Sequence, residues 1–502
     1  MSTAAITADV VVLGGGTAGC VVAAEAIRAG LAVVLVEAGP DYGRRDSGRW
    51  PAELLEPWTL PASHGWNFAE TLPGGRILPI ERGKVMGGCS SVNGCVAAWG
   101  SEADYNGWES ARGLAGWGAD AFRPELEAVD RALGVRQVTP DHLTPFQAGC
   151  LRAAMEIGFD FQEDVNDLAS DVGVGTVPRT VTGRTRYNAA FAFLDDLRRD
   201  RRLLILAGHL VDKLEIRGNV VTAIRVIGPA GPVRLAGGLV ILAAGVFGSP
   251  AILMRSGVGQ PAMLGRVGIK PVLPLPGVGA NLHDHPTVDV RFAGSAGLEK
   301  AMAAWLERTR VAEEPIVVKA RSSLPGDAFD LHVFPVAETP FEGRAWGWVL
   351  PIAGLTPRSR GTVRLTAPDP DAPPAISHAF LSDEAGYDVR MLADGIDLAR
   401  RMASAPGLSA LIGEEIEPRL TGPELAAWIR GAHHHYWHPV GTCRMGPSGD
   451  PAAVTGPDGR VRGLVNCLVA DASAMPAVPR ANTNLPTAAL ARKIARGAFA
   501  AA

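Results

Sequence analysis

The first strongly apolar run of the chain covers residues 10–13, and its length is typical of a strand that is buried on both faces. It is followed by Gly14, Gly16 and Gly19, then by an Ala-rich stretch with helical character, and then by a second apolar run at residues 32–36. This order of strand, glycine turn, helix and strand predicts a βαβ unit of a parallel sheet.

The three glycines have the G-x-G-x-x-G spacing of a dinucleotide-binding turn. One permits the tight turn, one lets the backbone approach a pyrophosphate, and one allows close packing of helix on strand. The start of the helix offers unpaired N–H groups to phosphates. Glu37 lies 18 residues after Gly19, where a carboxylate can accept hydrogen bonds from both ribose hydroxyls. The motif predicts a bound dinucleotide but does not distinguish FAD from NAD.

The apolar pattern changes later in the chain. Residues 201–228 have the pattern of strands joined by a hairpin turn at Gly218 and Asn219, and residues 237–245 contain another short buried strand. From about residue 287 to 435, glycine motifs give way to alternating segments such as FDLHVFPVA and WGWVLPIAG. This alternation is typical of an antiparallel sheet.

Composition excludes several classes of protein. The 502 residues are enough for two domains and a large core, and 47% hydrophobic and 20% charged residues are typical of a globular protein. A net charge of −4 without a basic stretch argues against nucleic-acid binding. No apolar run reaches the roughly 18 residues of a transmembrane helix, and no signal peptide is evident, so we expect a cytoplasmic protein. The six cysteines form no C-x-x-C pair and are expected to be reduced.

A second glycine-rich segment, RGKVMGGCSSVNGCVAAWG, covers residues 82–100. Its small residues let the backbone approach a flat or phosphorylated ligand without obstruction by a Cβ atom. Two such segments predict a ligand longer than one pyrophosphate, and a tightly held FAD fits. A loop that leads into a helix is the alternative that needs no ligand.

This segment resembles the first signature of the glucose-methanol-choline (GMC) oxidoreductases, and its residues are closest to the choline oxidase branch. Five further segments resemble the family in the same order: GVFGSPAILMRSGVG (245–259), LPGVGANLHDHP (275–286), SRGTVRLTAPDPDAPP (359–374), HPVGTCRMG (438–446) and LVADASAMPAVPRANTNLPT (468–487). The resemblance covers nearly the whole chain. It implies an α/β Rossmann-like FAD-binding domain of the GMC type and an α+β substrate domain with an antiparallel sheet.

The resemblance also implies a discontinuous layout and a set of cofactor contacts. Residues 1–150, 190–286 and 436–502 are expected to form the FAD-binding domain, and residues 151–189 and 287–435 the substrate-binding domain. The residues expected to bind FAD lie in the glycine segments, in a strand that meets the adenine and in a turn near the C-terminus. They are Gly14, Gly16, Thr17, Ala18, Gly19, Glu37, Ala38, Trp66, Gly87, Gly88, Cys89, Asn93, Val96, Val211, Asp471, Ala472 and Asn484.

Two departures from the choline oxidase pattern bear on the chemistry. Val92 stands where choline oxidase-like enzymes have a histidine bonded covalently to the flavin. Because valine has no nucleophile, we expect FAD to be held noncovalently. Gly94 replaces a serine that lines the choline oxidase site, which weakens an assignment of choline as substrate. Glu338 and Glu342 are able to recognise a cation, but surface-loop positions are expected for both.

Four histidines lie within six residues, at His433, His434, His435 and His438. The first three are consecutive, so their side chains fan apart, and Pro439 keeps residue 438 out of helical geometry. We therefore expect no metal site. The resemblance implies that His438 is a catalytic residue.

The partner that the resemblance implies for His438 is Asn482. When a flavin oxidises an alcohol, a hydride moves from the carbinol carbon to N5 and a proton leaves the hydroxyl. A histidine with a pKa near neutrality can take that proton, and an amide can donate to the developing alkoxide. A helix N-cap is the alternative for Asn482, although Asn484 is the better candidate for that cap.

These observations predict an FAD-dependent oxidoreductase that converts a small-molecule alcohol to a carbonyl. The electron acceptor is open between oxygen, a quinone and a redox peptide, and the bulk of Tyr436 beside the expected flavin face favours a dehydrogenase over an oxidase that forms hydrogen peroxide. A hydroxynitrile lyase-like protein is an alternative. A non-catalytic flavin-binding protein is disfavoured because both His438 and Asn482 are present.

Overall fold

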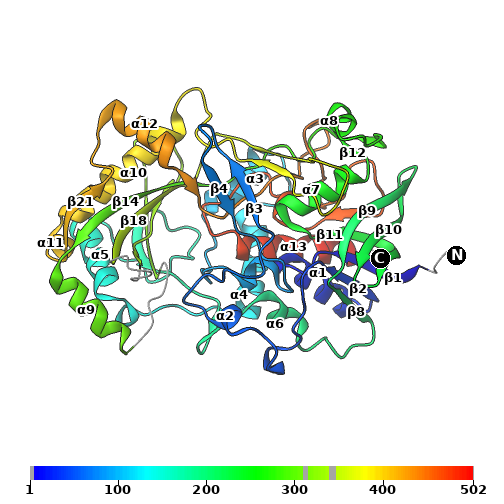
Figure 1. Cartoon of the computed structure of the whole chain (residues 1–502), viewed down its shortest axis with the longest axis horizontal. Coiled ribbons are helices and arrows are strands. Elements are labelled where there is room, and N and C mark those ends of the chain that lie inside the picture. The colour runs from blue at the N-terminus through cyan, green and yellow to red at the C-terminus, as the bar shows by residue number, and fades with distance from the viewer. Residues whose placement is uncertain (1–4, 309–314, 339–345, 501–502) are drawn as a thin grey trace.

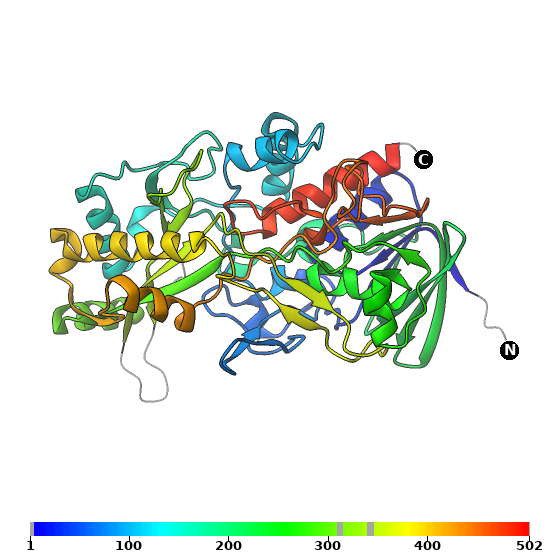
Figure 2. The same cartoon turned by 90° about the horizontal axis from the view of Figure 1, so that it is seen from above.

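The computed structural model describes residues 5–308, 315–338 and 346–500 and has two lobes along its longest axis (Figures 1 and 2). One lobe, on the right in Figure 1, holds a seven-stranded sheet and both labelled chain ends. The other lobe holds an eight-stranded sheet. Each sheet has its own hydrophobic core.

The seven-stranded sheet has the order β8-β2-β1-β11-β10-β9, with β23 added beside β11. Its parallel strands are β8 (Leu203–Ala207), β2 (Val33–Glu37), β1 (Ile6–Leu13), β11 (Gly231–Leu242) and β23 (Cys467–Val469). The antiparallel strands β10 (Val220–Gly228) and β9 (Leu210–Arg217) flank them and confirm the predicted hairpin turn. Helix α1 (Thr17–Arg28) joins β1 to β2, which confirms the predicted βαβ unit.

The eight-stranded sheet is antiparallel and has the order β21-β14-β18-β16-β15-β5. These strands are β21 (Ile412–Glu417), β14 (Pro286–Gly294), β18 (Gly347–Gly354), β16 (Leu331–Val333), β15 (Ile316–Ala320) and β5 (Gly173–Thr176). Two short strands complete it, because β22 (His434–His435) pairs with β14 and β17 (Val336–Glu338) pairs with β18. The predicted α+β lobe with an antiparallel sheet is therefore confirmed.

Strand β18 explains how this sheet serves both a core and a cavity. Successive side chains of a strand point to opposite faces. Leu350 and Ile352 pack in the core that helix α10 (Tyr387–Ser404) covers, whereas Val349 and Pro351 line a large cavity. The sheet thus forms one wall of that cavity.

The remaining elements connect and cover the two sheets. The helices are α2 (Ala52–Leu55), α3 (Glu102–Ser110), α4 (Ala119–Ala132), α5 (Pro145–Glu156), α6 (Ala189–Leu194), α7 (Gly245–Arg255), α8 (Pro261–Arg266), α9 (Ala296–Leu306), α11 (Pro406–Ser409), α12 (Gly422–Ala432) and α13 (Asn484–Ala500), with 3-10 turns η1 (Arg45–Ser47), η2 (Gly88–Ser91), η3 (Pro140–His142) and η4 (Ala472–Ala474). Small strand pairs are β3 (Phe68–Thr71) with β4 (Ile77–Ile80), β6 (Val181–Thr182) with β7 (Thr185–Arg186), β12 (Val258–Gly259) with β13 (Leu273–Pro274), and β19 (Thr362–Arg364) with β20 (Ala375–Ser377).

Helix α5 bears on the domain division. The expected boundary at residue 150 falls inside this helix, whose side chains Phe146, Cys150 and Leu151 pack in the core of the eight-stranded sheet. A boundary is better placed ahead of the helix. We propose the discontinuous division expected from the sequence, with α5 assigned to the lobe of the eight-stranded sheet.

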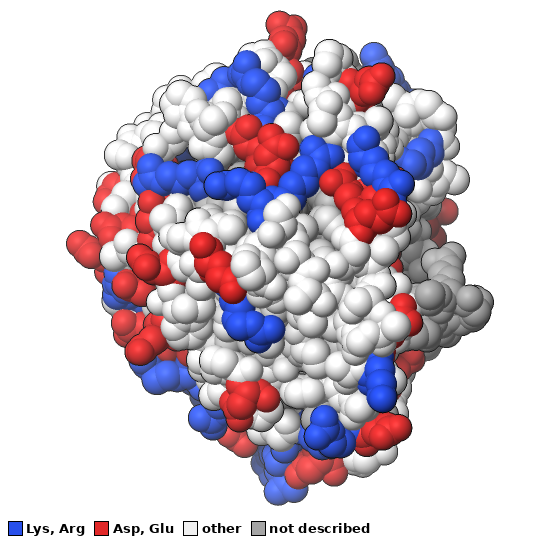
Figure 3. Space-filling view, turned by 90° about the vertical axis from the view of Figure 1, so that its left-hand side faces the viewer, with Lys and Arg blue, Asp and Glu red and all other residues white. Residues whose placement is uncertain are grey.

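The surface and the thiols fit a globular protein. All six cysteines are free. Cys89 is partly exposed, and the other five are buried. At the end of the eight-stranded lobe, acidic and basic side chains are interspersed (Figure 3). In the part of the chain that the structure describes, every helix is too short or too polar to cross a bilayer.

Candidate active site

A cavity of about 810 Å³ extends from the glycine turn after β1 to the wall formed by β14 and β18. Its volume lies in the upper part of the range of roughly 300–1,000 Å³ that is usual for small-molecule and cofactor sites. Both lobes contribute to its lining, and so do nearly all of the residues predicted to bind FAD. The exceptions, among the described residues, are Gly19 and Gly87.

Gly19 has a packing role instead. A Cβ atom at this position would lie 1.8 Å from the Gly14 carbonyl oxygen, so only glycine lets α1 lie this close to the end of β1. Gly14, Gly16, Thr17 and Ala18 line the cavity. Helix α1 has no side-chain cap and no acidic residue in its first turn. Its first N–H groups are therefore suited to hold a phosphate.

Glu37 lies at the same end of the cavity, at the end of β2. Its Oε2 accepts a hydrogen bond from the Gly15 N–H and its Oε1 accepts one from the Gly39 N–H, both at 2.8 Å. Burial raises the pKa of this carboxyl to about 7. Each oxygen keeps a second lone pair, so Glu37 can also accept from the hydroxyls of a ribose.

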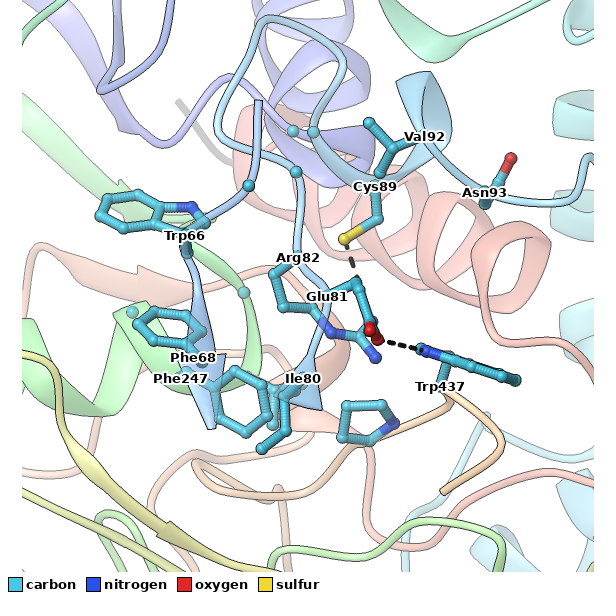
Figure 4. Close-up of a pocket in the computed structure, with 18 of the residues that line it drawn as sticks. Trp66, Phe68, Ile80, Glu81, Arg82, Cys89, Val92, Asn93, Phe247 and Trp437 are labelled. Carbon is cyan, nitrogen blue, oxygen red and sulfur yellow. Dashed lines mark hydrogen bonds between the residues drawn. The ribbon is translucent and has the colours of Figure 1, made fainter. Parts of the chain in front are cut away.

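The two glycine segments meet beside this end. A Cβ atom at Gly88 would lie 2.7 Å from the Gly16 Cα atom, so the segments approach at backbone distance. Cys89, Val92 and Asn93 follow along the cavity wall (Figure 4). The cavity is thus continuous from one glycine segment to the other, as a long dinucleotide requires.

The C-terminal turn borders the cavity from another side. Asp471 Oδ2 accepts from the Gly245 N–H at 2.8 Å and from Ser249 Oγ at 2.5 Å, while its Oδ1 accepts from the Ser473 N–H at 2.8 Å. Its carboxylate therefore holds the start of α7 against the turn. Near the start of α13, Asn484 Oδ1 accepts from Thr17 Oγ1 at 2.8 Å and joins α13 to α1.

Three other predicted cofactor residues also line the cavity. Trp66 stacks on Phe68 with ring centroids 5.7 Å apart, and these rings stand across the cavity from Trp437 (Figure 4). Val211 lies on β9 and Val96 on the second glycine segment. Helix start, carboxylate, small-residue wall and flanking indole together form a surface that fits an FAD molecule.

His438 and Asn482 both line the cavity. His438 Nδ1 is hydrogen-bonded to His285 Nδ1 at 3.1 Å, which leaves Nε2 as the ring nitrogen available to the cavity. Burial holds the pKa of His438 well below its ordinary value. The pKa of His438 is therefore lower than the near-neutral pKa that the sequence predicts. The ring is neutral, and a neutral imidazole can accept a proton.

The other histidines of the cluster bind protein groups. His434 Nε2 lies 3.2 Å from Asp289 Oδ1, and His435 Nε2 lies 2.7 Å from the Pro79 carbonyl oxygen. The His433 ring is buried and its Nδ1 lies 3.0 Å from the Arg430 carbonyl oxygen. Within residues 5–308, 315–338 and 346–500, no three His, Cys, Asp or Glu side chains are grouped to hold a metal ion.

An aromatic wall stands beside His438. Tyr436 and Phe334 are stacked with centroids 4.5 Å apart, and the Tyr436 ring lies 4.4 Å from that of His438. Glu338 also lines the cavity, but its carboxylate is paired with Arg291 at 2.7 Å. Glu342, the other acid considered for recognition of a cation, lies outside the described residues.

Some functional groups were missed by the sequence reasoning. His285 received no role from the sequence, yet its ring contacts the ring of His438. Asp284, which precedes it, accepts the His438 backbone N–H at 2.9 Å. Both residues lie in the segment NLHDHP, whose two histidines flanking an acid are the signal that the sequence offers.

Comparison with known proteins identifies what the chain resembles. Models of the GMC oxidoreductase family match residues 8–287 and 357–491. Choline oxidase of Arthrobacter globiformis is 30% identical over 523 residues, covering 95% of this chain and 91% of that protein. Oxygen-dependent choline dehydrogenase 1 of Chromohalobacter salexigens is 31% identical over 536 residues, covering 97% and 94%.

Solved structures give the same result. Pyridoxine 4-oxidase from Mesorbium loti superposes with a TM-score of 0.87 at 25% identity, covering 97% of this chain and 98% of that one. A fungal aryl-alcohol oxidase superposes with a TM-score of 0.80 at 21% identity, covering 98% and 99%, which shows a shared fold.

Proposed function

Because the chain belongs to the GMC oxidoreductase family and is an FAD-dependent oxidoreductase acting on CH–OH donors, we propose that it oxidises a small-molecule alcohol to a carbonyl at the cavity that His438 and Asn482 line. The observation that carries the proposal is the continuity of this cavity. One uninterrupted space joins the phosphate-binding start of α1 to the free nitrogen of the His438 ring.

The residues divide the work as follows. Bound FAD would supply the acceptor for the hydride that leaves the carbinol carbon. His438 accepts the hydroxyl proton at Nε2, since its Nδ1 is held by His285. Asn482 donates from its amide to the oxygen on which negative charge develops. The aromatic wall of Tyr436 and Phe334 limits the access of water to this part of the cavity.

A panel of alcohols tests the function. Anaerobic addition of a substrate is expected to bleach the visible absorbance of the bound flavin and to yield the matching aldehyde or ketone. The panel should contain choline, aromatic, aliphatic and sugar alcohols, because the named relatives differ in what they oxidise. Bleaching by none of them would favour a lyase-like protein that keeps FAD without net redox change.

We propose that FAD is held noncovalently. Val92, in the cavity wall, offers no nucleophile for a bond to the flavin. Acid precipitation is therefore expected to leave the yellow colour in the supernatant, and mass spectrometry of the protein should give the mass of the bare chain. Colour that stays in the pellet, with a matching increase in protein mass, would contradict this.

We also propose that the physiological acceptor is not oxygen. Tyr436 fills the space beside His438. Replacement by a smaller side chain, Tyr436→Val, should speed reoxidation of the reduced flavin by air about tenfold, which corresponds to about 1.4 kcal/mol of barrier. Tyr436→Phe keeps the bulk and serves as the control. Rapid formation of hydrogen peroxide by the unaltered protein would overturn the proposal.

A further inference from the structure

A chain of buried charged groups lies behind His438. His378 Nδ1 lies 2.6 Å from Glu70 Oε2, and the His378 backbone N–H donates to Glu70 Oε1 at 3.0 Å. The other ring nitrogen of His378, Nε2, lies 3.6 Å from Asp284 Oδ2. The three side chains are between 1% and 4% exposed. Both nitrogens of this imidazole therefore lie near carboxylate oxygens. The Nε2 contact is longer than a hydrogen bond, and among the described residues neither His378 Nε2 nor Asp284 Oδ2 has a hydrogen-bond partner, so their interaction is electrostatic.

Asp284 connects this chain to the catalytic histidine. Its Oδ1 accepts from the His285 N–H at 2.7 Å and from the His438 N–H at 2.9 Å. The two histidines are in turn joined through their Nδ1 atoms. The Asp284 carboxylate thus fixes the backbone of both His285 and His438. The contact between these two rings in turn sets the direction of His438 Nε2.

Burying an ionised carboxylate is costly unless a positive charge lies nearby. Burial raises the pKa of Asp284 to about 6, while the charges of His378 and Arg82 act to lower it. Arg82 lies in the cavity wall with Cys89 (Figure 4), and its Nε and Nη2 atoms are buried without a hydrogen-bond partner among the described residues. Its charge is therefore available to Asp284. Among the described residues, the titratable or charged groups that act on Asp284 are Arg82, His285, His378 and His438, and Glu70 and His435 lie next to His378.

We propose that Asp284 is a positioning residue for His438, and that the Glu70–His378 pair keeps it ionised. An ionised Asp284 accepts the two backbone N–H groups strongly and places a negative charge near the ring that must become an imidazolium when it takes the proton. This role rests on the proposed function of His438. Glu70 and His378 act only through Asp284 and do not line the cavity among the described residues.

The first test is kinetic and uses the flavin-loaded protein with its best alcohol. For His378→Gln we expect the limiting rate of flavin reduction at pH 7 to fall on the order of tenfold, a part of the roughly 10²–10⁴-fold that a general base supplies. The substrate concentration for half-maximal reduction should stay within twofold. Because the variant lacks one charge that lowers the pKa of Asp284, the acidic limb of the rate profile should move to higher pH.

Two variants make this test specific. Asp284→Asn keeps an oxygen that can accept both N–H groups but removes the charge. It should therefore slow flavin reduction and abolish the acidic limb of the rate–pH profile. His283→Gln is the matched control. His283 is buried in the same segment, but its ring is hydrogen-bonded to the Pro357 carbonyl oxygen and not to Glu70, Asp284 or His378. Equal effects of His378→Gln and His283→Gln, or an unshifted acidic limb, would overturn the proposal.

The second test does not depend on activity. In His378→Gln, the buried Glu70 carboxyl loses the ring that contacts it, so Tm should fall. Glu70→Gln combined with His378→Gln should recover part of that loss. If no alcohol reduces the unaltered protein, the proposed function fails, but these variants still test the coupling between Glu70 and His378. Losses of Tm that are simply additive in the double variant would refute that coupling.

Discussion

His438→Ala is expected to lower the rate of flavin reduction by alcohol by roughly 10²–10⁴-fold, the contribution usual for a general base. The ring is the only part removed, and its Nε2 is the nitrogen that faces the cavity once Nδ1 is bound to His285. The FAD content should stay unchanged, because the cofactor contacts lie in other segments. Stopped-flow reduction under anaerobic conditions measures the effect.

The matched control for this variant is His433→Ala. His433 belongs to the same cluster and is equally buried, but its ring lies against the Arg430 carbonyl oxygen and does not line the cavity among the described residues. It should reduce at nearly the rate of the unaltered protein. Equal losses in both variants would mean that His438 acts through folding and not as a base.

Gly19→Ala is expected to abolish stable FAD binding and to destabilise the protein by about 3 kcal/mol, the upper part of the usual range for overpacking. The new Cβ atom would lie 1.8 Å from the Gly14 carbonyl oxygen and 2.9 Å from its carbonyl carbon. Both are backbone atoms, so relief requires α1 to move away from β1. That movement takes the phosphate-binding N–H groups out of place.

Gly107→Ala provides the control for this substitution. Gly107 is also in a helix, α3, and an added Cβ atom meets nothing within 4 Å. Alanine in an open helical position stabilises by about 0.5–1 kcal/mol relative to glycine. Flavin content after purification and the free energy of unfolding should therefore fall for Gly19→Ala only. A yellow, stable Gly19→Ala protein would contradict the proposed packing role.

Local sequence patterns predicted the parts of the structure that depend on neighbouring residues. The run at residues 10–13, the glycine turn and the run at residues 32–36 each fix their own conformation, and the structure has β1, α1 and β2 there. The hairpin at Gly218 and Asn219 was predictable for the same reason. The sequence does not show against which sheet the apolar face of α5 packs, and for that reason the boundary proposed at residue 150 did not take this helix into account.

The contacts among Glu70, His378 and Asp284 could not be predicted from the sequence alone. Glu70, Asp284 and His378 are separated by about two hundred and about ninety residues and share no motif. Their proximity arises only when the β3–β4 hairpin, the start of β14 and the segment after β20 converge. The low pKa of His438 was missed for a related reason, since the burial that causes it is a property of the folded cavity.

The most direct test of the account is a crystal structure of the FAD-loaded protein with a substrate alcohol, or an unreactive analogue of it, bound under anaerobic conditions. We expect the hydroxyl oxygen to lie about 2.6–3.2 Å from both His438 Nε2 and the Asn482 side-chain nitrogen, with the carbinol carbon facing the flavin N5 atom. A bound alcohol that contacts neither side chain, or a flavin whose reactive edge is turned away from them, would contradict the account.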